Sequence, residues 1–243
     1  MSDTFTKAYT SPDRAGMAVS HHAWLRSMGA PVPALLDASP EELVFAHVEG
    51  EHCGLADFPA VAALLGHLHA TAFAHQLRAA RLDAPFSAPN GVRLAEFVNP
   101  RLDLLEGRRR EGILSGPQYE AAATLITGAS QRPAAFYKDS NIRNVLIGVT
   151  SPVLVDFDDL TLAPFGYDLA KLLVSAAMTY GPLDGSLCRR TLDSYRHAVE
   201  AAGGPVDCCS WEELGNWTEI HDLLTSGYLG RNGYKHRWTG LPS

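Results

Sequence analysis

The sequence predicts an α+β fold, in which a short strand-containing N-terminal part precedes a mostly helical remainder built around one β-hairpin. Two apolar runs at residues 145–149 and 153–157 flank turn-forming residues that include Gly148, Thr150 and Pro152, which is the pattern of a hairpin. Several segments after residue 58 carry apolar residues at helical spacing. Before residue 49, strand-like runs surround a single helix-like segment. Together these observations favour α+β over an all-α class.

The N-terminal part is predicted to begin with a short strand at residues 5–9. Ser11 and Pro12 are typical of a helix start, with serine as the cap and proline in the first turn. Apolar residues continue at helical spacing until Gly29 ends the helix. Prolines then mark a loop, and residues 43–48 form an apolar run that predicts a buried strand.

Six further helices are expected, at residues 59–81, 94–110, 116–126, 167–180, 191–202 and 211–229. Ser210 and Glu213 form a capping box at the start of the last one. His67 and His69 in the first are two residues apart and point to different helix faces, so we do not expect a metal pair.

Composition excludes several classes of protein. The chain has 243 residues, 46% hydrophobic and 19% charged, which is ordinary for a globular protein. A net charge of −7 disfavours nucleic acid and anionic membranes as partners. Its four cysteines have neither zinc-site nor disulfide-framework spacing, and we find no signal peptide or membrane span. We therefore expect a cytoplasmic protein.

Three oxygen-bearing side chains should converge at one edge of the hairpin. Asp139 and Asn144 precede its first strand, and Asp156 ends its second. An antiparallel pair places the start of one strand beside the end of the next. Magnesium prefers oxygen ligands and binds through one or two carboxylates together with substrate phosphates.

The spacing Asp-x-x-x-x-Asn, followed by Asp-Phe-Asp, resembles the catalytic and metal loops of kinase-fold phosphotransferases. The later run Gly-Tyr-Asp-Leu-Ala at residues 166–170 resembles more narrowly the aminoglycoside phosphotransferase and choline kinase family. This resemblance implies a protein-kinase-like bilobal fold. Residues 1–48 would form a reduced nucleotide-binding lobe, and residues 49–243 a helical catalytic and substrate lobe.

The resemblance also implies roles for individual residues. Asp139 would align the acceptor hydroxyl and accept its proton, while Asn144 and Asp156 would bind Mg²⁺. Lys7 would hold the phosphates of ATP or another nucleoside triphosphate. The hinge that meets the adenine with its backbone would consist of Phe45, Ala46, His47 and Val48.

The sequence departs from the family pattern at three places. Only six residues precede Lys7, which leaves no room for a glycine-rich phosphate loop, and residues 16–20 lack the expected helix glutamate. The start could be internal to a longer gene, the lobe could be reduced, or nucleotide binding could be lost. Tyr137 and Lys138 replace the usual His-Gly. Lys138 could affect the pKa of Asp139, approach phosphate or face solvent.

Two other side chains have secondary interpretations. Asp158 is a possible second metal or substrate contact, with Asp159 structural. Arg143 could reach a phosphate, although a surface ion pair is the simpler expectation.

The predicted function is an ATP- and magnesium-dependent transfer of phosphate to a hydroxyl of a small molecule. An aminoglycoside or another amino-containing antibiotic is the expected acceptor, which implies a role in antibiotic resistance. Acidic residues that could attract such a cation are Glu96, Asp103, Asp158, Asp159, Glu219 and Asp222. The alternative is a catalytically impaired kinase-fold protein with a binding or regulatory role.

Overall fold

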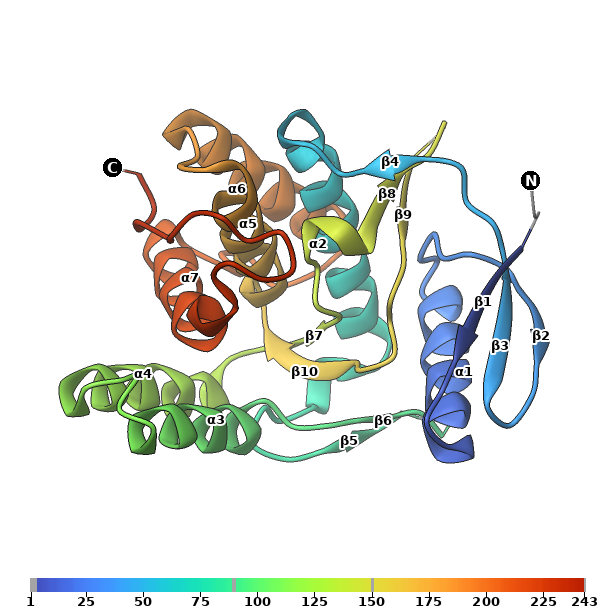
Figure 1. The fold of residues 1–243 in the computed structure, drawn as a ribbon, viewed down its shortest axis with the longest axis horizontal. Helices are drawn as coiled ribbons and strands as arrows, with labels where there is room; N and C mark the ends of the chain where they lie inside the picture. The colour runs from blue at the N-terminus through green and yellow to red at the C-terminus, as the bar shows by residue number, and fades with distance from the viewer. Residues whose placement is uncertain (1–3, 89–90, 150, 243) are drawn as a thin grey trace.

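The computed structural model describes residues 4–88, 91–149 and 151–242. Its elements form two groups in Figure 1: a small sheet with one helix at the right of the view, and a larger, mainly helical group. This arrangement agrees with the α+β class predicted from the sequence. In the described ranges, no helix combines the length and apolar character needed to cross a membrane.

The N-terminal sheet has the strand order β1–β3–β2, and both strand pairs are antiparallel. The elements of this group are β1 (Thr4–Ala8), α1 (Pro12–Ser27), β2 (Leu35–Ala38) and β3 (Glu42–Ala46). α1 begins as predicted, because the Ser11 side chain accepts a hydrogen bond from the backbone N–H of Arg14. β2 was not predicted, since its mostly exposed residues lack an apolar alternation.

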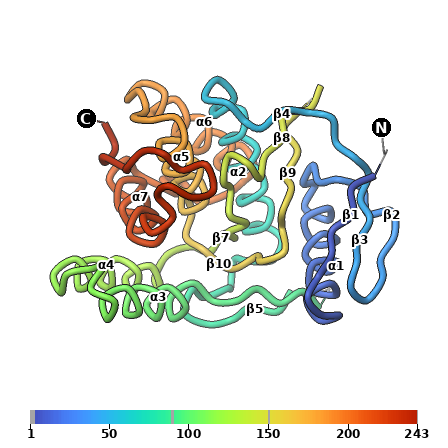
Figure 2. Tube along the Cα trace, viewed as in Figure 1, coloured from blue at the N-terminus to red at the C-terminus, as the bar shows by residue number. Residues whose placement is uncertain are grey.

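The predicted hairpin forms from β8 (Val145–Ile147) and β9 (Pro152–Leu154), with Val145 opposite Leu154. Thr150 of the predicted turn lies outside the described residues. The tube in Figure 2 shows the chain leaving β3 and crossing to β4 (Glu51–His52), which pairs with β8. The hairpin thus extends to a three-stranded sheet of order β4–β8–β9. This crossing links the N-terminal group to the hairpin.

Six α-helices make up the bulk of the larger group: α2 (Phe58–His75), α3 (Val98–Arg110), α4 (Gly116–Gly128), α5 (Tyr167–Tyr180), α6 (Gly185–Ala201) and α7 (Trp211–Thr225). Short helical turns are η1 (Leu55–Asp57), η2 (Leu77–Ala79), η3 (Ala129–Gln131), η4 (Ile142–Asn144) and η5 (Ser226–Tyr228). α6 begins six residues before the predicted residue 191, because the Asp184 side chain caps it by accepting from the N–H of Leu187. α3 begins at Val98 and not at residue 94, since Arg93–Leu94 pair as β6 with β5 (Phe86–Ser87).

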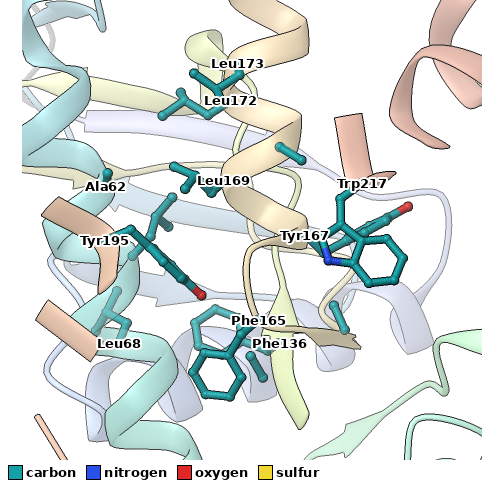
Figure 3. Close-up of a cluster of buried hydrophobic side chains, with 14 of the residues drawn as sticks. Ala62, Leu68, Phe136, Phe165, Tyr167, Leu169, Leu172, Leu173, Tyr195 and Trp217 are labelled. Atoms are coloured by element: carbon teal, nitrogen blue, oxygen red, sulfur yellow. The ribbon is translucent and has the colours of Figure 1, made fainter. Parts of the chain in front are cut away.

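The core of the larger group surrounds α5, on which every residue from Tyr167 to Met178 is buried. A helix that is apolar on all sides is typical of a central position. Figure 3 shows Leu169 of α5 beside Tyr195 of α6, with Phe136 and Phe165 beneath them and Leu172 above. His69 is fully buried and His67 is exposed, so the two side chains lie on different faces of α2, as their spacing predicts.

Two strands that the sequence did not predict support the candidate catalytic loop. β7 (Ala134–Tyr137) pairs antiparallel with β10 (Thr161–Pro164), with Tyr137 opposite Thr161. Each is a four-residue, mostly buried run without polar alternation. Short apolar runs of this kind do not distinguish strand from helix, and their pairing is decided by partners distant in sequence.

Candidate active site

The loop after β7 presents Asp139 in the left-handed backbone conformation, with φ at 61°. Aspartate tolerates this conformation better than most residues, but it requires support from its surroundings. Asp168, fully buried at the start of α5, accepts hydrogen bonds from the backbone N–H groups of Lys138 at 3.2 Å and Ser140 at 2.7 Å. These bonds brace the loop on both sides of Asp139.

The Asp139 carboxylate has one occupied and one accessible oxygen. Its Oδ1 accepts a hydrogen bond from the Tyr137 hydroxyl at 3.1 Å and lies 3.3 Å from the Lys171 ammonium. Within the described ranges Oδ2 has no protein partner, and 46% of the side chain is exposed. The arrangement orients the carboxylate and leaves Oδ2 available to a hydroxyl group.

Lys138 neither faces solvent nor reaches a cavity that could hold phosphate, which were two of the positions considered for it. Its side chain is buried, and its ammonium donates to the carbonyl oxygens of Asn144 at 3.4 Å and Val155 at 3.2 Å. Burial lowers the pKa of Lys138, against the opposing charges of Asp168, Asp139 and Asp156. Lys138 therefore connects the Asp139 loop to the backbone at both candidate metal ligands.

Asn144 and Asp156 meet at the edge of the hairpin, as the antiparallel pairing predicts. The N–H of Val155 donates to the carbonyl oxygen of Asn144 at 3.0 Å, which places Asp156 just beyond this contact. The Asn144 amide nitrogen donates to the carbonyl oxygen of Asp139 at 2.8 Å. Its Oδ1 is therefore the end available to a cation. Asp156, with φ at 57°, has a side chain that is 55% exposed.

Lys7 on β1 lies between two carboxylates of the hairpin segment. Its ammonium is 2.7 Å from both Asp156 Oδ1 and Asp158 Oδ2, and Asp158 also accepts from the Tyr9 hydroxyl at 3.1 Å. Partial burial alone would lower the pKa of Lys7, but the hydrogen bonds and charges of the two acids raise it overall. Asp156 and Asp158 are thus the two acidic partners of Lys7.

Asp159 has a structural role, as the sequence indicated. Arg14 on α1 binds it in a bidentate pair at 2.7 and 3.0 Å. The contact ties α1 to the segment that follows β9.

A cavity of about 430 Å³ lies between the N-terminal sheet and the hairpin. All four predicted hinge residues line it, together with Lys7, Asn144 and Asp156; the full lining is Phe5, Lys7, Tyr9, Pro33, Phe45, Ala46, His47, Val48, His52, Arg143, Asn144, Leu146, Val155, Asp156, Phe157 and Asp158. Its wall is mainly apolar, with the carboxylates at one end. This combination suits a flat heteroaromatic ring with a phosphate chain. We call it the nucleotide-side cavity.

A second, polar cavity of about 270 Å³ lies beside Asp139. It is lined by Tyr137, Asp139, Asn141, Arg143, Lys171, Tyr228, Asn232 and Tyr234. We call it the acceptor-side cavity. Sequence reasoning did not assign Lys171 or the C-terminal residues to a site, because they lie far along the chain from Asp139. A buried lysine in an otherwise apolar helix was the available signal for Lys171.

The residues present suit a magnesium ion bound together with phosphate. The described part of the chain contains no cluster of three or more His, Cys, Asp or Glu side chains that would hold a metal unaided. Asp156 and the oriented amide of Asn144 instead offer two oxygens at the end of the nucleotide-side cavity. Magnesium is commonly held by one or two such ligands, with phosphates and water completing its octahedral shell.

Comparison with known proteins identifies a family. A family model described as the phosphotransferase enzyme family matches residues 11–209 of the chain. No curated protein sequence matches it.

Solved structures of kinase-like fold superpose on most of the chain. An amicoumacin kinase in complex with AMP-PNP, Ca²⁺ and Ami has a TM-score of 0.66 at 14% identity, and the match covers 92% of this chain and 73% of that chain. A macrolide 2'-phosphotransferase from Brachybacterium faecium has a TM-score of 0.64 at 16% identity, with coverages of 93% and 76%. An aminoglycoside phosphotransferase from Streptomyces rimosus, in complex with ADP and streptomycin, has a TM-score of 0.56 at 14% identity, with coverages of 91% and 87%. At these identities the likeness establishes the fold.

Proposed function

The chain belongs to the phosphotransferase enzyme family, and within it we propose that this protein transfers the γ-phosphoryl group of ATP to a hydroxyl of a small molecule. The observation that carries the proposal is the placement of Asp139, Asn144 and Asp156 around two cavities that share one lining residue, Arg143. A donor in one cavity and an acceptor in the other would meet at this point. Phosphoryl transfer needs this alignment more than it needs covalent chemistry from the protein.

In the proposed reaction, the acceptor hydroxyl oxygen forms a bond to the γ-phosphorus. The bond from that phosphorus to the β,γ-bridging oxygen breaks, and ADP leaves. Asp139 accepts the hydroxyl proton on Oδ2, while Tyr137 and Lys171 hold Oδ1 in place. The role of Asp139 is chiefly to position the hydroxyl, because an ordinary aspartate is a weak base.

The nucleotide would occupy the cavity lined by Phe45, Ala46, His47 and Val48, whose backbone would meet the adenine. Lys7 would bind its phosphates. Asn144 and Asp156 would hold a Mg²⁺ ion, which when bound neutralises phosphate charge.

For the acceptor, we propose an aminoglycoside or another amino-containing antibiotic. The similarity to kinases named for amicoumacin, macrolide and aminoglycoside substrates supports an antibiotic. Of the six acids expected to attract a cation, Asp158 and Asp159 are already paired with Lys7 and Arg14, and none lines the acceptor-side cavity. A cationic acceptor would therefore rely on Asp139 itself and on the aromatic rings of the cavity, such as Tyr228 and Tyr234.

A second candidate function is a non-catalytic binding or regulatory role. One observation favours it: Lys7 neutralises both Asp156 and Asp158, so a carboxylate proposed for the metal is already paired. Lys7 would have to move toward the phosphates, or share its ammonium between them and Asp156, before the Asp156 carboxylate could bind a metal ion.

The first prediction separates these functions by calorimetry and a transfer assay. We expect wild-type protein to bind ATP in the presence of Mg²⁺ and to convert ATP to ADP only when a hydroxyl acceptor is supplied. Asp139→Asn should bind ATP as the wild type does but lose about 10²–10⁴-fold in turnover, since proton transfer and alignment depend on this carboxylate.

The matched control is Asp193→Asn, which removes an exposed carboxylate on α6. It should leave both binding and turnover unchanged. Absence of ATP binding at millimolar concentration would refute the kinase proposal. ATP binding without transfer to any of a panel of aminoglycosides, macrolides and amino alcohols would favour the binding role.

A further inference from the structure

Arg143 is the one residue, among those the structure describes, that lines both cavities. Its guanidinium carbon lies 4.8 Å from the ring centroid of Tyr234, and a Cβ added at Gly233 would lie 2.9 Å from its Nη1. No carboxylate in the described ranges pairs with it. The expectation of a surface ion pair for Arg143 is therefore wrong.

Lys171 brings a second cation to the acceptor-side cavity. It projects from α5 with a side chain that is only 9% exposed, and its ammonium lies 3.3 Å from Asp139 Oδ1. An ammonium has three N–H donors, and Asp139 is its only hydrogen-bonding or ionic partner in the described part of the chain. The remaining donors face the cavity that Lys171 lines.

Within the acceptor-side cavity the charges are unbalanced, whereas the carboxylates of the nucleotide-side cavity are paired with Lys7. Two cations, Arg143 and Lys171, face a single carboxylate, Asp139, in the acceptor-side cavity. A partly buried site with excess positive charge favours an anion, because the low local dielectric strengthens the attraction. An acceptor that carries only amines would not supply that anion.

We propose that Arg143 and Lys171 form a two-cation binding site for the phosphoryl group as it passes from the nucleotide-side cavity to the acceptor-side cavity. The inference rests on the proposed kinase function and adds a binding site to it. Guanidinium and ammonium donors make short, charge-assisted hydrogen bonds to phosphate oxygens. Donors already in place as charge spreads over the transferring group stabilise the transition state.

The cations that line the two cavities fall into two groups under this proposal. Lys7, held by Asp156 and Asp158, serves the end of the cavity nearest β1, whereas Arg143 and Lys171 serve the end nearest Asp139. A nucleotide that lacks the γ-phosphate would reach the first group only.

The test compares binding of ADP and of AMP-PNP, each with Mg²⁺, by calorimetry. Arg143→Met should bind ADP within about twofold of the wild type but AMP-PNP at least roughly tenfold more weakly, because only AMP-PNP carries the third phosphate. Lys171→Met should show the same selective loss. Arg110→Met, which removes an exposed cation on α3, should change neither affinity.

A double variant shows whether Lys171 contacts the phosphate or acts only by neutralising Asp139. If it contacts the phosphate, Asp139→Asn with Lys171→Met should remain weak for AMP-PNP; recovery to the affinity of Asp139→Asn alone would overturn its place in the site. Equal weakening of both nucleotides, or of neither, in Arg143→Met would overturn the role of Arg143.

These failures differ from a failure of the kinase proposal. In that case wild-type protein would bind neither ADP nor AMP-PNP, and the two-cation site would be refuted with it. ADP binding within twofold of wild type also verifies that each variant is folded, and Arg143→Lys should recover part of the AMP-PNP affinity.

Discussion

At the scale of single residues, buried polar side chains hold the candidate catalytic loop. Asp168 accepts hydrogen bonds from the backbone on both sides of Asp139, and the ammonium of Lys138 donates to the carbonyl oxygens of Asn144 and of Val155, which precedes Asp156. A buried polar group without a partner is costly, so each of these bonds restricts where the loop can lie. Asp139 and Asp156 both adopt left-handed backbone conformations that this support sustains.

His69 lies beneath the same loop in an environment that excludes its charged form. The ring is fully buried, its Nδ1 is 2.8 Å from the Tyr195 hydroxyl, and its Nε2 is 3.9 Å from Asp168. Burial lowers the pKa of His69 from 6.5 to about 3. The imidazole is therefore neutral at physiological pH, and its approach to Asp168 is not an ion pair.

This depressed pKa predicts a pH-dependent part of the stability. Below pH 6.5 the unfolded chain protonates His69 while the folded protein does not, so stability present above this pH is lost as pH falls toward 3. The free energy of unfolding should fall by up to about 1.4 kcal/mol for each pH unit below 6.5. Urea unfolding of wild-type protein and of His69→Asn between pH 7 and 4.5 gives the free energy of unfolding of each. The difference between the two, plotted against pH, measures the contribution of His69.

Asparagine can still hydrogen-bond to Tyr195 but does not titrate, so it isolates the histidine. Burial raises the pKa of Asp168, which acts in the opposite direction on stability. Parallel stability profiles for the two proteins would contradict the prediction.

At the scale of elements, the packing of α2 against α6 determines the position of the helical core. Gly66 of α2 faces the backbone of α6, where an added Cβ would lie 2.4 Å from the carbonyl oxygen of Tyr195. That distance is shorter than any real contact of a Cβ atom. The close approach brings Tyr195 to His69 and to the N–H of Gly166, to which its hydroxyl is bonded at 3.0 Å.

Gly66→Ala should consequently destabilise the protein by about 1–3 kcal/mol, because α6 must shift to admit the methyl group. Gly16→Ala in α1 is the matched control, since nothing lies within 4 Å of its added Cβ. It should stabilise the protein by up to about 1 kcal/mol, through helix propensity alone. Thermal unfolding of both variants measures the change in Tm that each causes. Equal changes in Tm would show that α2 and α6 can move apart to admit the methyl group at little cost.

At the scale of the whole molecule, the N-terminal sheet and the hairpin are joined across the nucleotide-side cavity by charged pairs. Lys7 binds Asp156 and Asp158, and Arg14 binds Asp159. Such exposed or half-exposed pairs contribute little stability by themselves. The two groups also pack through aromatic contacts, such as Trp24 with Phe136 and Phe45 with Phe157. A ligand that fills the cavity would add contacts to both groups.

Binding of ATP should therefore stabilise the whole molecule in a magnesium-dependent manner. At about 100 times its Kd, ATP with Mg²⁺ should add about 2.7 kcal/mol, or roughly 5–10 °C in Tm for a chain of this size. Removal of the metal with EDTA should abolish most of this rise in Tm. Asp156→Asn should lose the magnesium-dependent part, measured by thermal unfolding with and without EDTA.

Asp193→Asn again provides the control, because its carboxylate is exposed and distant in sequence from the hairpin. It should keep the full shift. A magnesium-dependent shift that survives Asp156→Asn would exclude Asp156 as a ligand.

Local features of the fold followed from the sequence. The cap of α1 at Ser11, the capping box at Ser210 and the limits of α5 depend on residues within a few positions of one another. The hairpin follows from two adjacent apolar runs, and its pairing brings Asn144 to Asp156. The four-residue strands β7 and β10 were missed, because an apolar run that short acquires its structure from a distant partner.

The sequence by itself determined the α+β class, the family resemblance and the candidate residues Asp139, Asn144 and Asp156, because each depends on local pattern or on the pairing of neighbouring strands. Only the tertiary structure placed Lys7 against Asp158, buried Lys138 under the loop and brought Lys171 to Asp139. Those contacts join residues up to about 150 positions apart, and the direction of a long flexible side chain depends on which partners the completed core presents to it.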